Sequence, residues 1–135
     1  MKYIEVMRII TTLKGEPMKL SIEVGQKEPT LMTVKEILLQ YLGGFGSISV
    51  DGRPAQIEGK KQVMAYNISL ALYRHKIDMF EVEDAEFELI KESLKVAVHG
   101  ALILGQVRLA LDEAEERAKK KAEKEKEKEK KKDPK

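Results

Sequence analysis

Residues 77–111 constrain the fold more than any other stretch, because they combine the highest apolar content of the chain with its clearest helical period. Acidic side chains at Glu83, Asp84 and Glu86 come first and suit the positive end of a helix dipole. Apolar residues then recur three and four positions apart, at Phe87, Ile90, Leu94, Val98 and Ala101. This pattern predicts a helix over residues 84–98, and we expect the whole stretch to form bent helical scaffolding.

A break in this stretch is expected near His99 and Gly100. Gly100 and Gly105 bracket four apolar residues, after which a helical pattern resumes. One side of that last helix carries Leu104, Val107, Leu111 and Ala114. Gln106 is polar within this apolar surround, so it requires a hydrogen-bond partner if it is buried. We interpret Gln106 as a structural amide.

The N-terminal part of the chain has the pattern of antiparallel strands. Residues 3–12 are rich in β-branched side chains, and apolar and polar residues alternate over 18–24. Between them lies the turn sequence of residues 14–17, in which Gly15 can adopt a positive φ. A second, smaller hairpin is predicted over residues 47–57, closed by an Asp-Gly pair.

Two further helices are predicted between the hairpins and the central stretch. Thr33 and Glu36 match a capping box, in which each side chain bonds a free backbone amide at a helix start. That helix is expected to close at Gly43-Gly44 with a left-handed residue. The second helix, over residues 60–75, carries two neighbouring apolar stripes, which predicts that it is covered on more than one side. The stripes are Val63, Tyr66, Leu70 and Tyr73, and then Met64, Ile68 and Leu72.

These elements predict an α+β fold, with one or two N-terminal antiparallel hairpins packed against three to four helices. Residues 1–111 are expected to form a single compact domain. Residues 112–135 are rich in Lys and Glu and lack an apolar stripe. They are expected to form either a helical extension or a disordered tail, since Glu and Lys pairs four residues apart support a helix.

Composition excludes several classes of function. The chain has 25 basic and 23 acidic residues, and the two signs balance within residues 1–111, so its body gives no electrostatic case for nucleic acid. Cysteine is absent, which removes disulfides and thiolate chemistry. Neither a membrane-spanning run nor a signal-peptide core is visible, so we expect a cytoplasmic protein without membrane partners. Abundant Lys and Glu, with a single asparagine at Asn67, are typical of heat-adapted proteins.

No catalytic, cofactor-binding or metal-binding motif is recognisable. His75 follows a helix that ends in basic residues, and His99 lies at the expected break, so the two histidines make a poor metal pair. The acidic residues Glu81 and Glu83 suit a helix start better than general acid-base chemistry. The glycine-rich residues 43–46 follow a helix end, whereas phosphate loops precede a helix start. We therefore predict no enzymatic activity and no cofactor.

Basic side chains provide the candidate partner-binding residues. If nucleic acid is a partner, the surface patch would combine with the Lys-rich tail. The residues of this patch are Arg53, Lys60, Lys61, Arg74 and Lys76. The glutamates interleaved in the tail weaken that alternative.

Two runs in the second half of the chain resemble a family of small, uncharacterised bacteriophage and prophage proteins. The first is YNISLALYRHKIDMFEVEDAEFELIKESL and the second is HGALILGQVRLALDEAE. The likeness covers residues 34–111 and lies mainly in core positions, including Phe87 to Lys91 and the Gly105-Gln106 pair. It implies a viral or prophage origin, in the host cytoplasm or on the virion.

The same resemblance implies a non-enzymatic role. Together with the surplus of apolar helical surface, it predicts a protein that binds another protein, of phage or host, or that forms a homo-oligomer. A nucleic-acid-binding regulator is the alternative.

Overall fold

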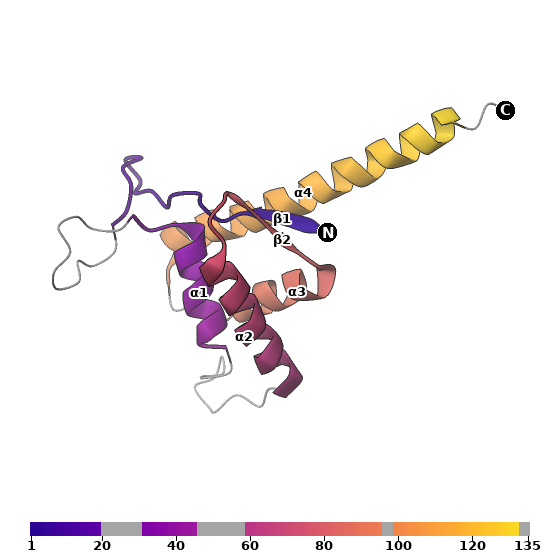
Figure 1. Ribbon diagram of the computed structural model, residues 1–135. Helices are drawn as coiled ribbons and strands as arrows, with labels where there is room; N and C mark the ends of the chain where they lie inside the picture. The colour runs from indigo at the N-terminus through magenta and orange to yellow at the C-terminus, as the bar shows by residue number, and fades with distance from the viewer. Residues whose placement is uncertain (20–30, 46–58, 96–98, 133–135) are drawn as a thin grey trace.

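The computed structural model describes residues 1–19, 31–45, 59–95 and 99–132, with the side chains of α4 described to residue 127. The elements of this part of the chain are β1 (Lys2–Glu5), α1 (Val34–Gly43), α2 (Gly59–Arg74), β2 (Met79–Val82), α3 (Asp84–Ser93) and α4 (Ala101–Lys132). Figure 1 shows α1, α2 and α3 on one side of the small sheet, with α4 passing along it and projecting beyond. The predicted α+β class is confirmed.

The sheet joins the N-terminus to the segment between α2 and α3. β1 pairs antiparallel with β2, from Lys2 opposite Val82 to Glu5 opposite Met79. The prediction that the central stretch is helical throughout is therefore wrong over β2. Phe80 and Val82 face the core while their neighbours face solvent, so this short segment follows the two-residue period of a strand.

The N-terminal segment reverses direction at Gly15, which has a φ of 87°. The Met18 amide donates to the Ile10 carbonyl at 2.8 Å, and Thr11 and Pro17 form an isolated bridge. The predicted turn is thus present, but the regular ladder of the first strand is made with β2 and not with the segment after the turn. Residues 20–24 of that predicted hairpin, and all of the one over 47–57, lie outside the described residues.

The start of α1 shows why the chain forms a helix there. The amides of Val34 and Lys35 donate to the carbonyls of Arg8 and Val6 at 3.0 and 2.8 Å, and the Glu36 amide donates to the Thr33 hydroxyl at 3.4 Å. These bonds satisfy amides that an isolated helix leaves free. They also fix α1 against the turn that follows β1.

One predicted cap conformation and one predicted helix boundary need correction. α1 ends at Gly43-Gly44 as predicted. Gly44 closes α1 with a φ of −92°, so neither it nor Gly43 adopts the left-handed conformation that was predicted. α3 ends at Ser93 and not at Val98, which lies outside the described residues. The start of α3 at Asp84 is as predicted, and there the Glu83 amide donates to the Glu86 carboxylate at 2.9 Å.

Lys35 connects α1 to the end of α2. Its side chain is 9% exposed, and its ammonium group donates to the carbonyls of Tyr73 and His75 at 3.1 and 2.7 Å. These carbonyls lie at the negative end of α2, where a cation is favoured. Besides Arg74 in its own last turn, this helix end is therefore complemented by a cation from a neighbouring helix.

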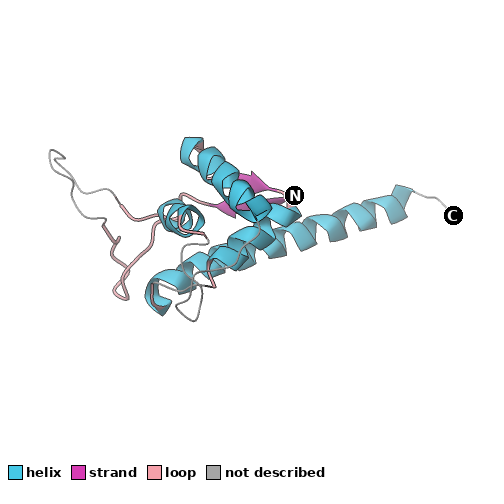
Figure 2. Cartoon of the chain, turned by 90° about the horizontal axis from the view of Figure 1, so that it is seen from below, coloured by secondary structure: helices cyan, strands magenta, loops and turns pink. Residues whose placement is uncertain are grey.

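α4 packs against β1 and α1 with one face, and Figure 2 shows it continuing past the N-terminus. The predicted apolar side is buried, and its last buried residue is Ala114. Glu113 pairs with Arg8, and Arg117 donates to the Tyr3 carbonyl at 2.6 Å. Packing of α4 against the body therefore continues past Leu111, and the charged sequence beyond it is helical as far as Lys132.

Candidate functional site

The outward face of α2 carries an exposed apolar stripe. Val63, Tyr66 and Tyr73 are 61%, 62% and 69% exposed, and Leu70 between them is half-buried. The opposite face of the helix buries Ala65, Ile68 and Leu72 in the core. α2 was predicted to be covered on more than one side, and both α1 and α3 pack against it. The described residues nevertheless leave the stripe of Val63, Tyr66 and Tyr73 largely exposed. We call Val63, Tyr66, Leu70 and Tyr73 the outer stripe.

Most of the predicted partner-binding residues lie around this helix. Lys60, Arg74 and Lys76 are exposed near its two ends. Lys61 turns to the other side, where its ammonium group lies 3.2 Å from the Glu92 carboxylate of α3. Arg53 lies outside the described residues. The structure thus groups three of the five around the outer stripe.

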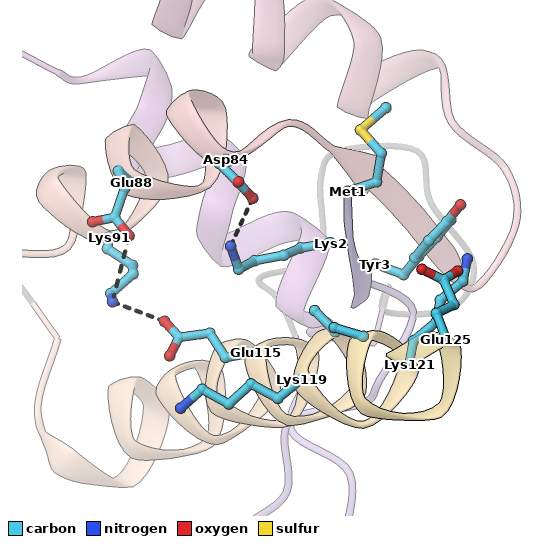
Figure 3. A pocket seen from close by; sticks show the side chains of 12 residues that line it. Met1, Lys2, Tyr3, Asp84, Glu88, Lys91, Glu115, Lys119, Lys121 and Glu125 are labelled. Carbon is cyan, nitrogen blue, oxygen red and sulfur yellow. Dashed lines mark hydrogen bonds and ion pairs between the residues drawn. The ribbon is translucent and has the colours of Figure 1, made fainter. Parts of the chain in front are cut away.

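A cleft of about 640 Å³ opens where α4 leaves the body (Figure 3). Four lysines and four carboxylates line it, together with Met1, Tyr3 and two alanines of α4. Lys2 lies 2.8 Å from Asp84, and Lys91 lies 2.8 Å from Glu115 and 3.9 Å from Glu88. The charged side chains on the α3 side are therefore largely engaged with one another.

The pKa directions in this cleft follow from the ion pairs. The hydrogen bond from Lys2 lowers the pKa of the Asp84 carboxyl, and the bond from Lys91 lowers that of Glu115. The same Glu115 contact raises the pKa of Lys91. All three shifts move the pKa values further from neutral pH, whereas a general acid or base needs a pKa near the working pH. This arrangement suits structural pairing better than proton transfer.

Both histidines, and the acidic residue Glu81, also make contacts that hold parts of the fold together. The Tyr41 hydroxyl accepts the His99 amide at 2.9 Å and lies 3.1 Å from its Nδ1 atom. The ring of His75 bonds the Met79 carbonyl at 2.7 Å. Glu81 accepts from the Tyr3 hydroxyl at 3.2 Å. Among the residues described, no three His, Asp or Glu side chains gather as metal ligands.

Three residues near the start of the last helix were predicted to be structural, namely Gly100, Gly105 and Gln106. Gly100 directly precedes α4, and its carbonyl accepts the first helical bond from Leu104, whereas Gly105 lies inside the helix. The side chain of Gln106 accepts from the Thr11 amide at 2.9 Å and donates to the Thr11 carbonyl at 2.8 Å. Gln106 thus finds its partner in the N-terminal segment.

Sequence reasoning missed Lys35 and Arg8, which hold separate elements together. Lys35 lies in the first turn of a helix, where it reads as a solvated charge. Arg8 bonds Glu5 at 2.8 Å and also Glu113, far away in sequence. No local pattern marks either contact, because each depends on how distant segments pack.

Comparisons with known proteins found no relative of this chain. The sequence matches no protein-family model, and no curated protein or solved structure is significantly similar. In the part of the chain that the structure describes, none of the helices combines the length and the apolar character that a bilayer crossing requires.

Proposed function

We propose that this chain is a non-enzymatic interaction protein of the bacteriophage type, which acts by binding another protein or a second copy of itself. The observation that carries this proposal is the outer stripe of α2. Large side chains left this exposed in a row are typical of surfaces that a partner covers. Its role is an accessory or assembly role in the host cytoplasm or on the virion.

The outer stripe favours protein binding because its neighbours on the same helix are already used for folding. α2 packs against both α1 and α3 (Figure 1). The helix therefore keeps its place in the body without the outer stripe. Tyrosine is also enriched at interfaces, since its ring buries a large area and its hydroxyl stays hydrogen-bonded.

A photo-crosslinking amino acid at Tyr66 tests the proposal in cells that produce the protein. Illumination should yield a discrete heavier product, and light scattering of the purified chain then separates self-association from a foreign partner. The matched control carries the same amino acid at Leu13, which is 94% exposed on the N-terminal turn. A strict monomer that gives no product specific to position 66 would refute the proposal.

Nucleic-acid binding is the second candidate, supported by the projecting part of α4. Lys120, Lys121 and Lys124 are exposed there, at a spacing that sets them along one side of the helix. Phosphate contacts would make such binding fall steeply with salt. A gel shift at low salt, repeated with a chain ending at Arg117, tests it. Equal binding by both chains would remove the projecting helix from this role.

A further inference from the structure

The outer stripe has the spacing of a coiled-coil seam. Its four residues lie three, four and three positions apart, which is the a and d pattern of two heptads. Such a seam receives the side chains of a second helix between its own. The spacing of these residues is therefore the one by which two helices pack side by side.

The positions that flank the seam carry only basic or neutral side chains. Lys60, Asn67 and Arg74 recur seven residues apart along one edge, and Gln62 and Ser69 lie along the other. α2 contains neither Asp nor Glu. In helix pairs, the charges at these flanking positions set the choice of partner.

We propose that the outer stripe docks an acidic amphipathic helix of another protein. The apolar side chains of the partner helix lie between the four residues of the outer stripe. The carboxylates that flank them lie near Lys60 and Arg74. A second copy of α2 is a poorer occupant, since pairing two of these helices in either direction gathers basic charge without any compensating acid. This inference rests on the proposed function and names the chemistry of the partner.

Two synthetic peptides of about three heptads test this directly. Both carry leucine at the a and d positions. One has glutamate at the flanking positions, and the other has lysine there. Fluorescence anisotropy with the full chain should show the glutamate peptide binding at least about tenfold more tightly than the lysine peptide. Its affinity should weaken as salt is added.

Variants of the stripe locate the binding. Y66S/Y73S should weaken the glutamate peptide about tenfold or more, and K60E/R74E should shift the preference toward the lysine peptide. Because these side chains are exposed, circular dichroism should show unchanged folding. L13S, which removes an equally exposed apolar side chain elsewhere, should bind as the parent does.

Three outcomes would overturn the inference. The two peptides would bind alike, or the stripe variants would leave binding unchanged, or a labelled oligothymidylate would bind through Tyr66 and Tyr73 while neither peptide binds. A crosslink at Tyr66 without binding of the glutamate peptide would support the proposed function but refute the inference that the partner is an acidic helix. If Tyr66 gives no crosslink and the glutamate peptide does not bind, both the proposed function and the acidic helix are refuted.

Discussion

Single side chains, and Lys35 most clearly, join elements that are far apart in sequence. Its ammonium group bonds two carbonyls at the end of α2 from a position in α1. Substitution by methionine keeps the apolar stem and removes the charge-assisted bonds. We predict that Lys35→Met lowers the free energy of unfolding by about 2 kcal/mol, measured in urea. Lys14→Met, at an exposed lysine, is the control and should be nearly neutral. Equal stability of the two variants would contradict this role.

The ion pairs of α4 predict how stability depends on pH. The hydrogen bond from Arg8 lowers the pKa of Glu113, and Lys91 does the same for Glu115. A carboxyl whose folded-state pKa is lowered stabilises the fold above its ordinary pKa, and this contribution is lost as the pH falls through the folded-state value. We therefore predict that the free energy of unfolding declines on the acid side of the glutamate range.

Glu113→Gln tests that prediction, because it removes the titrating group and keeps the shape. The variant should be less stable than the parent at neutral pH, and its stability should fall less steeply with acid. Glu16→Gln, at an exposed residue outside these pairs, serves as the control and should follow the parent curve. An acid dependence that Glu113→Gln leaves unchanged would argue against this pair.

At the scale of elements, local chemistry predicted helices well and pairing partners poorly. The Thr33 cap, the acidic start of α3 and the buried side of α4 are each marked by neighbouring residues. β2 was missed because its four residues lie inside a longer apolar stretch, although the alternation of Phe80 and Val82 with acidic residues was visible. The partner of β1 lies more than seventy residues away, and no local pattern encodes that distance.

The candidate site shows the same limit. The two apolar stripes of α2 were visible as a pattern, but the pattern does not tell which one the body covers. That choice depends on how α1 and α3 pack against α2, and in the fold Ile68 and Leu72 are buried. Only the fold shows that the described residues leave the outer stripe exposed.

Gln106 joins α4 to the N-terminal segment, so its substitution tests a contact between elements. Replacement by methionine preserves the length of the side chain and leaves the amide and carbonyl of Thr11 without their partner. We predict that Gln106→Met lowers the free energy of unfolding by about 1 to 2 kcal/mol. Gln62→Met on α2 is the matched control, because Gln62 is exposed. The result would be contradicted if both glutamines tolerated methionine equally.

For the whole molecule, the charged composition and the linked ion pairs predict resistance to heat. Arg8 pairs with two carboxylates, and so does Lys91. Networks of this kind gain importance at high temperature, since the cost of removing water from charges falls. We expect a melting temperature above about 65 °C by calorimetry, beyond the usual range of mesophilic domains. A value within that range would refute heat adaptation.

The extent of the folded body is tested by two shortened chains. A chain ending at Lys121 keeps Ala114, Arg117 and the pairs made by Glu113 and Glu115, whereas a chain ending at Leu111 loses them all. The longer one should melt within a few degrees of the full chain, because α4 is exposed from Lys121 to Glu127. The shorter one loses packing against β1, which is worth about 2 kcal/mol or more, and should melt at least about 8 °C lower. Equal melting of the two shortened chains would place the end of the body at Leu111 after all.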